Sequence, residues 1–306
     1  MDNASSSPLS SPRTSARSAN EFIEQQLDER IERIEAEYRA HAICFNGPIV
    51  AGVDDIIRKA VERRRDLPPP RNRLVVLLTT GGGYIEVVQR IVATLRSHYK
   101  VVDFIVPNYA YSAGTVLALS GDAIHMDYYS RLGPIDPQVE NASGRLIPAL
   151  GYVEKYNKLL EKATAGQISL AEMQLLIHGF DQAELHSIEQ SRELSIALLK
   201  EWLVKYKFKN WRHTETRKLK VTKQMKIERA EAIARDLNET KKWHVHGHGI
   251  SMEVLQDDLK VLIDDFGAEP ELAEAIGEYN DLISDYMARR GTQGVLHFTG
   301  NYTPFM

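Results

Sequence analysis

The clearest hydrophobic pattern in the chain is the uninterrupted apolar run from Leu74 to Leu78, made of aliphatic residues. A strand that is apolar on both faces is typical of the centre of a parallel sheet. Three glycines at 81–83 follow this run, then an amphipathic helical pattern over 84–97 and a further strand pattern over 101–106. Strand, glycine turn, helix and strand make a βαβ unit, which predicts a right-handed crossover over a parallel sheet.

The same pattern repeats directly downstream. A second turn at 108–114 leads into a helix of small and apolar residues over 115–120, and a short strand is predicted over 123–126. Residues 74–138 thus present two strand-to-helix turns at one edge of the sheet, one rich in glycine and the other containing Ser112. Because ligands of open α/β sheets bind at the carboxyl ends of the strands, we expect the functional site at this edge.

Helical patterns flank this unit on both sides. The predicted helices cover 21–39, 53–65, 155–162, 169–177, 181–206 and 270–290, and further strands are predicted over 42–45 and 295–298. The apolar stripe of the first helix has two interpretations, packing on the following domain or formation of an oligomer, and we favour packing.

Composition narrows the class of protein. Of 306 residues, 43% are hydrophobic and 26% charged, with 38 Lys+Arg against 42 Asp+Glu, which excludes collagen-like or disordered chains and disfavours a nucleic-acid-binding protein. The single cysteine, Cys44, excludes an intramolecular disulfide and a multi-thiolate metal site, so we expect a cytoplasmic protein. No apolar run approaches the length of a transmembrane anchor, which leaves peripheral membrane association as an option.

Two segments have a biased composition. Residues 1–20 contain seven serines, two prolines and two arginines without an apolar core, which predicts a disordered tail, with a transit peptide as the alternative. Residues 205–229 hold ten Lys/Arg against two Glu, with aromatics near the start. Such a segment could bind nucleic acid or anionic lipid, but we favour a solvated helical face because the whole chain is acidic.

Ser112 is the best candidate nucleophile. A serine at a strand-to-helix turn lies at the positive end of a helix, although the elbow pattern G-x-S-x-G is met only as Ala110-x-Ser112-x-Gly114, and a simple helix cap is the alternative. The glycines at 81–83 favour a catalytic role for Ser112 over a helix cap, because exposed N–H groups in such a turn can bind an oxyanion. A phosphate-binding loop is disfavoured, since Lys-Ser/Thr is lacking and Glu86 follows.

Three sequence blocks carry a family resemblance. They are Thr79-Thr80-Gly81-Gly82-Gly83, Tyr111-Ser112-Ala113-Gly114-Thr115 and Ser130-Arg131-Leu132-Gly133-Pro134-Ile135-Asp136-Pro137-Gln138. Together with the tryptophan, histidine and isoleucine at 243, 246 and 250, they resemble the serine dehydrogenase proteinase family, which is related to signal peptide peptidase A and the Clp proteolytic subunit. The resemblance covers about residues 41–266.

This resemblance implies an α/β fold of the Clp/crotonase type, built from repeated ββα units with added helices at both ends. With the composition and the helical patterns, it divides the chain into a disordered tail over 1–20, an amphipathic helix over 21–40, a protease domain over 41–266 and a helical extension over 267–306. It also implies Ser112 as the nucleophile. The oxyanion hole would be formed by the N–H groups of Gly82 and Ala113, with Gly83 beside them in the oxyanion and substrate-binding turn.

The resemblance leaves the general base open. The Clp subunit uses a histidine at the position that holds Asp136 here, 24 residues after Ser112. The signal peptide peptidase branch uses a lysine where this chain has Tyr152, and Lys155 lies about one helical turn further on. We therefore expect Lys155 as the base with Asp136 orienting or shaping the loop, and a solvated surface lysine is the alternative.

The histidines are weaker candidates for catalytic or metal-binding residues. His125, on a predicted strand, is more typical of a sheet residue than of a triad member. His244, His246 and His248 alternate and could bind zinc, but the resemblance accounts for His246 as part of a structural turn, so we expect no metal ion.

We therefore predict a serine-type peptidase with a Ser/Lys dyad, no cofactor, a peptide or protein substrate and a homo-oligomeric state. The alternatives are a non-catalytic oligomeric scaffold of the same fold that binds peptides or a partner protein, and acyl-CoA chemistry of the crotonase type.

Overall fold

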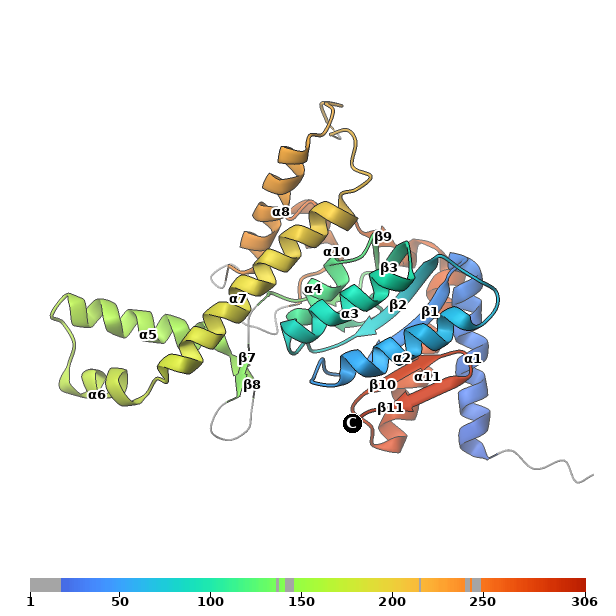
Figure 1. Cartoon of the computed structure of the whole chain (residues 1–306), viewed down its shortest axis with the longest axis horizontal. Coiled ribbons are helices and arrows are strands. Elements are labelled where there is room, and N and C mark those ends of the chain that lie inside the picture. The colour runs from blue at the N-terminus through green and yellow to red at the C-terminus, as the bar shows by residue number, and fades with distance from the viewer. Residues whose placement is uncertain (1–17, 136–137, 141–145, 215, 240–242, 244–248) are drawn as a thin grey trace, which may run out of the picture.

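A mostly parallel sheet forms the centre of the computed structural model, which describes residues 18–135, 138–140, 146–214, 216–239, 243 and 249–306 (Figure 1). The order of its seven strands is β11-β10-β1-β2-β3-β5-β9. The strands are β1 (His41–Asn46), β2 (Arg73–Thr79), β3 (Val101–Ile105), β5 (Ala123–Met126), β9 (Asp264–Asp265), β10 (Val295–Phe298) and β11 (Asn301–Pro304). Two small sheets join β4 (Tyr109–Ala110) to β6 (Arg131–Leu132) and β7 (Gln138–Glu140) to β8 (Leu146–Pro148).

The strand pairing confirms the expected α/β architecture with a parallel centre. From β1 through β2, β3 and β5 to β9 every pair is parallel, whereas β10 and β11 extend the sheet in the antiparallel sense. The run at Leu74–Leu78 forms most of β2 and is buried throughout, as a strand covered on both faces requires. The C-terminal segment thus adds a helix and also two strands to the sheet.

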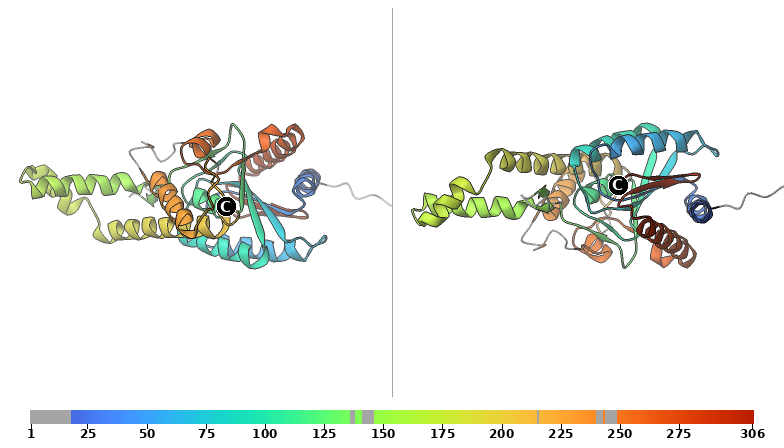
Figure 2. Two further views of the ribbon diagram at one scale, coloured as in Figure 1. Left: turned by 90° about the horizontal axis from the view of Figure 1, so that it is seen from above. Right: turned by 90° about the horizontal axis from the view of Figure 1, so that it is seen from below.

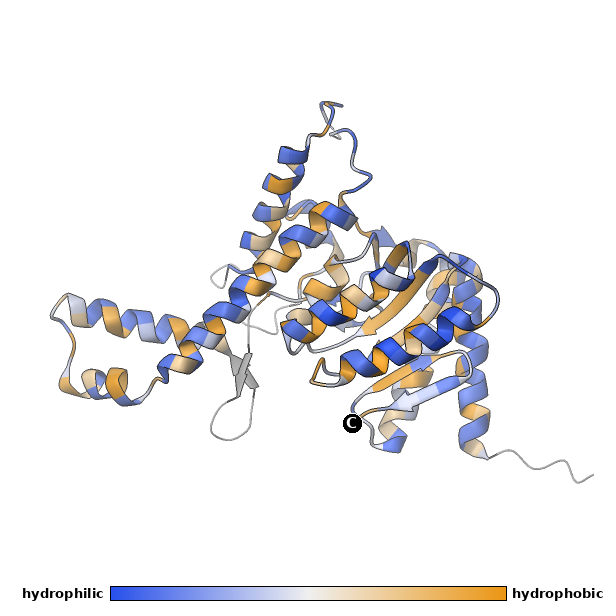
Figure 3. Ribbon diagram, in the orientation of Figure 1, coloured by the Kyte–Doolittle hydropathy of each residue, from blue (hydrophilic) through white to orange (hydrophobic). Residues whose placement is uncertain are grey.

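Each face of the sheet has its own helical layer and hydrophobic core. One core draws on residues of α2 (Val53–Asp66), α3 (Ile85–His98), α4 (Ala113–Leu119), α7 (Gln182–Trp202), α8 (Lys223–Leu237) and α10 (Met252–Asp257), and the other on residues of α1 (Ala19–Tyr38) and α11 (Pro270–Arg290). Side chains alternate between the two cores along β1 and β2: Val76 belongs to the first core and Leu77 to the second. In Figure 3 the apolar residues follow the central strands accordingly.

The first helix packs on the domain that follows it, as we favoured from its sequence. Leu27, Ile31 and Ile34 of α1 are fully buried in the core shared with α11. An ion pair joins α1 to α2, in which Arg64 contacts the Glu35 carboxylate at 2.7 Å with only 3% of the Arg64 side chain exposed. The ion pair therefore holds α1 against α2, and the shared core holds α1 against α11.

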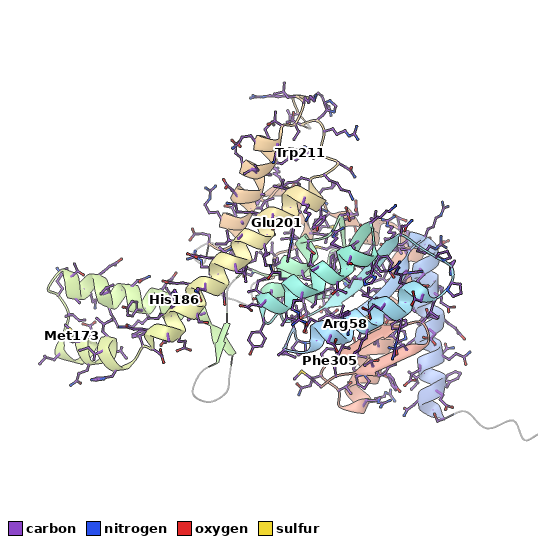
Figure 4. The ribbon with its side chains drawn as sticks, viewed as in Figure 1. Arg58, Met173, His186, Glu201, Trp211 and Phe305 are labelled. Atoms are coloured by element: carbon purple, nitrogen blue, oxygen red, sulfur yellow. The ribbon has the colours of Figure 1, made fainter. Side chains whose placement is uncertain are left out.

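A helical arm projects from the body of the molecule (Figures 1 and 2). It is built from α5 (Ala149–Thr164), α6 (Leu170–His178) and the first turns of α7. No residue of α6 is buried, although the helix contains Leu170, Leu175 and Ile177, which are at least 43% exposed. Met173, also on α6, lies at the far end of the arm in Figure 4.

The basic segment departs from the expected helical face. After α7 a short π-helix, η1 (Leu203–Lys207), leads into a non-helical stretch over 208–222, with residue 215 outside the described part, and α8 starts only at Lys223. Trp211 marks this stretch in Figure 4. The expected helical face over 205–229 is therefore met only at its two ends, in η1 and in α8, and not over 208–222. Within the described residues, every helix is too short or too polar to cross a bilayer.

Candidate active site

Ser112 adopts a strained conformation at the junction between β4 and α4. Its φ of 53° and ψ of −121° lie outside the favoured regions of an L-residue, which costs about 1 to 3 kcal/mol. Its side chain makes no capping hydrogen bond to the first turn of α4. This overturns the alternative of a simple helix-capping serine. Ser112 is only 5% exposed.

Hydrogen bonds to two other segments hold the serine turn in place. Thr80, which follows β2, donates its N–H to the carbonyl of Tyr109 and accepts the N–H of Tyr111, both at 3.0 Å. On the other side, the hydroxyl of Thr115 lies 2.8 Å from the Ala110 carbonyl oxygen and 2.9 Å from that of Gly133. The strain at Ser112 is therefore maintained by its neighbours, and the third sequence block contributes through Gly133.

The glycine turn lies directly against the serine turn. Gly82 has a φ of +100°, and a Cβ atom there would lie 2.7 Å from the carbonyl oxygen of Tyr111 and 2.9 Å from the Cβ of Ser112. The same virtual atom would be 3.3 Å from the backbone nitrogen of Ala113. The two turns that the sequence places at one sheet edge are thus in contact, and this contact requires glycine at position 82.

The backbone N–H groups of this region differ in their partners. The Gly82 N–H, expected as an oxyanion donor, donates instead to the hydroxyl oxygen of Thr80 at 3.1 Å. Within the described part of the chain, the N–H groups of Gly83 and Ala113 donate no hydrogen bond. The carbonyl of Gly82 accepts the Ile49 N–H at 2.9 Å. Because a trans peptide points its N–H opposite to its C=O, the Gly83 N–H points away from Ile49.

The expected base is not close to this site in the single chain. Lys155 lies on α5 of the projecting arm, where its side chain is exposed, and no described hydrogen bond or ion pair joins it to Ser112. Asp136 lies outside the described residues, as do His244, His246 and His248. The structure therefore brings Ser112, Gly82, Gly83 and Ala113 together and does not bring Lys155 to them.

His125 belongs to a different environment. It is buried on β5, where its ring meets that of Tyr38 edge to face at 4.8 Å, and its Nδ1 lies 4.0 Å from a carboxylate oxygen of Asp264. Burial lowers the pKa of His125, so the neutral ring is favoured. No described contact joins this ring to Ser112, in agreement with its interpretation as a sheet residue.

Cys44 does not compete with Ser112 as a nucleophile. It is 4% exposed in the core between β1 and the α1–α11 layer. Burial raises the pKa of its thiol to about 12. Since the thiolate is the reactive form of cysteine, Cys44 is chemically inert in the folded chain.

Sequence reasoning missed two contributors to this site. The Thr80 hydroxyl accepts the Gly82 N–H, and the sequence signal for this bond is a threonine two residues before a glycine. Ile49 contributes through its backbone alone, at a parallel bridge with Gly83, so no side-chain pattern could reveal it.

The geometry defines a nucleophile turn and a glycine turn in contact at the carboxyl edge of a parallel sheet, a place where α/β proteins build their sites. Comparison with known proteins agrees with this description. The family model for ClpP-like SDH-type serine proteinases matches residues 37–238, about two thirds of the chain. The chain therefore belongs to this family of serine proteinases.

Two relatives come from Methanocaldococcus jannaschii. The uncharacterized protein MJ1495 is 27% identical over 157 residues, which cover 49% of this chain and 50% of the relative. The uncharacterized protein MJ0137 is 42% identical over 57 residues, or 19% of this chain and 20% of the relative. The chain thus spans half or less of the length of these two relatives.

Proposed function

We propose that the chain is a serine peptidase in which Ser112 forms an acyl-enzyme with its substrate. The observation that carries this proposal is a strained, buried serine whose turn contacts the glycine turn, where the Ala113 and Gly83 N–H groups donate no hydrogen bond to the residues that the structure describes. Each backbone N–H donor that is fixed before the reaction stabilises the oxyanion of the transition state by about 3 to 4 kcal/mol. Membership of a serine proteinase family supports the same conclusion.

In the proposed reaction, Ser112 Oγ attacks the carbonyl carbon of a peptide bond while a base removes the hydroxyl proton. The negative charge that develops on the carbonyl oxygen is held by the Ala113 and Gly83 N–H groups. Gly82 supplies the close approach of the two turns. The base then passes its proton to the leaving amine, and water hydrolyses the resulting ester at Ser112.

We propose that Lys155 is the general base and that Asp136 is the carboxylate that orients it. A lysine needs a desolvated site to act as a base. Lys155 is exposed on an arm whose neighbouring helix α6 also exposes apolar side chains. We therefore propose that the working form is a homo-oligomer in which this arm is covered and Lys155 reaches the Ser112 of a neighbouring copy, and that Lys155 acts only in that form.

The proposed base has a matched control on the same helix. Lys155→Met is expected to abolish peptide cleavage, whereas Lys158→Met, a change of an exposed lysine three residues further along α5, should preserve it. Equal activity of both variants would remove Lys155 from the mechanism and leave the rest of the proposal in place.

Cleavage of a peptide library tests the function itself. The wild-type chain is expected to cleave peptides at a cytoplasmic pH without added metal or cofactor, and Ser112→Ala should cleave none. The exposure of Lys155 favours a second candidate, a non-catalytic scaffold that binds peptides. Retention of library peptides by both proteins, with cleavage by neither, would establish the scaffold and refute the peptidase.

A further inference from the structure

We propose that Thr80 is a positioning residue that sets the oxyanion donors against the nucleophile. This inference rests on the proposed function and deepens it. Thr80 follows the last residue of β2, is 2% exposed, and belongs to neither the nucleophile nor the donors. Its side chain contacts both turns of the site, one through the hydroxyl and the other through the methyl group.

The hydroxyl fixes the glycine turn. Three successive glycines have little conformational preference of their own, so the turn needs external restraints to keep one geometry. Gly82 has two such restraints: its N–H donates to Thr80 Oγ1 at 3.1 Å, and its C=O accepts the Ile49 N–H at 2.9 Å. Both peptide groups that flank Gly82 are thereby held, and the second of these contains the Gly83 N–H.

The methyl group fixes Thr80 itself to the serine helix. A Cβ atom placed on Gly114, two residues after Ser112, would lie 2.3 Å from Thr80 Cγ2. The methyl group therefore occupies the space that the missing side chain leaves. Together with the backbone bonds of Thr80 to Tyr109 and Tyr111, this contact leaves little freedom for the side chain. Thr80 thus transmits the position of the serine turn to the glycine turn.

The two functions of the side chain can be separated by substitution. Thr80→Val keeps the methyl group against Gly114 and removes the hydroxyl, whereas Thr80→Ser keeps the hydroxyl. The adjacent Thr79→Val is a matched control, because Thr79 is also buried, at 8% exposure, and its hydroxyl makes no hydrogen bond within the described structure.

The test measures acylation of Ser112 with a fluorophosphonate probe and with an activated p-nitrophenyl ester. The loss of one positioning hydrogen bond predicts acylation about 3- to 10-fold slower for Thr80→Val with KM for the ester unchanged. The acylation rate of Thr80→Ser should stay within about 2-fold of wild type, and that of Thr79→Val should equal the wild-type rate. If Thr80 contributed only to stability, Thr80→Val would lower the melting temperature and would not lower kcat selectively at an unchanged KM.

Several results would overturn the inference. Acylation of Thr80→Val at or above the wild-type rate would show that the hydroxyl does not help the donors. If Thr80→Val does not fold, Thr80→Ala against Thr80→Ser isolates the hydroxyl, and equal rates of that pair refute the proposal. Failure of the proposed function itself is recognised separately, because Ser112→Ala would then react with the probe as the wild type does.

Discussion

Replacement of Gly82 by alanine tests the contact between the two turns most severely. The residue has a left-handed φ of +100°, in which an L-side chain costs about 1 to 2 kcal/mol. The added Cβ would also lie 2.7 Å from the Tyr111 carbonyl oxygen and 2.9 Å from Ser112 Cβ. The closest of these atoms belongs to the backbone, so the serine turn itself has to move.

The expected magnitude follows from these two contributions. Overpacking of this kind costs a further 1 to 3 kcal/mol, so Gly82→Ala should lower the free energy of unfolding by about 2 to 5 kcal/mol. For a chain of 306 residues this corresponds to a fall in melting temperature of roughly 3 to 8 °C. A shift of the reacting groups by up to 1 Å costs about 100-fold in rate, and fluorophosphonate labelling of Ser112 should slow accordingly.

Gly81→Ala is the matched control within the same three glycines. A Cβ atom on Gly81 meets no atom within 4 Å, and its backbone is not left-handed, so both melting temperature and labelling should stay close to wild type. Similar labelling rates and melting temperatures for Gly81→Ala and Gly82→Ala would refute the close contact of the two turns.

Two further predictions concern buried titratable groups. His41 is fully buried between the Tyr99 hydroxyl and the Pro69 carbonyl, each 2.8 Å away, and burial lowers its pKa. A lowered folded-state pKa means that stability is fully present above the unfolded value of about 6.5 and is lost as the pH falls below it. Melting temperatures between pH 8 and 5 should therefore fall more steeply for wild type than for His41→Gln, and parallel curves would contradict this. Cys44 should resist a thiol-specific chromogenic reagent in the native state and react after denaturation, because its thiol is buried with a pKa of about 12; rapid native reaction would exclude the buried position.

The sequence was informative where the structure depends on local pattern. The apolar run of β2, the glycine turn and the turn with Ser112 follow one another in the chain, and parallel strands bring their carboxyl ends to one edge. The contact between Gly82 and the residues around Ser112 could therefore be predicted from the sequence. Which N–H groups lack a partner among the described residues could not be predicted, because it depends on the bonds of Thr80 and Ile49 to Gly82.

Tertiary placement explains what the sequence could not predict. Helical spacing predicted α5 around Lys155 but carries no information about the direction in which that helix leaves the sheet. Likewise, the basic residues around Trp211 suggested a helical face, whereas η1 ends at Lys207 and the chain turns before α8. The strand β9 pairs with β5, which is distant in the sequence, and has no apolar run of its own.

The central claim is that Ser112 is a nucleophile assisted by the Ala113 and Gly83 N–H groups. The most direct measurement is reaction of the native chain with a fluorophosphonate probe, followed by proteolytic digestion and mass spectrometry of the labelled peptide. The account predicts one adduct, on Ser112, that is absent from Ser112→Ala and from the denatured wild-type chain. An adduct on another residue, or equal labelling of native and denatured chains, would contradict it.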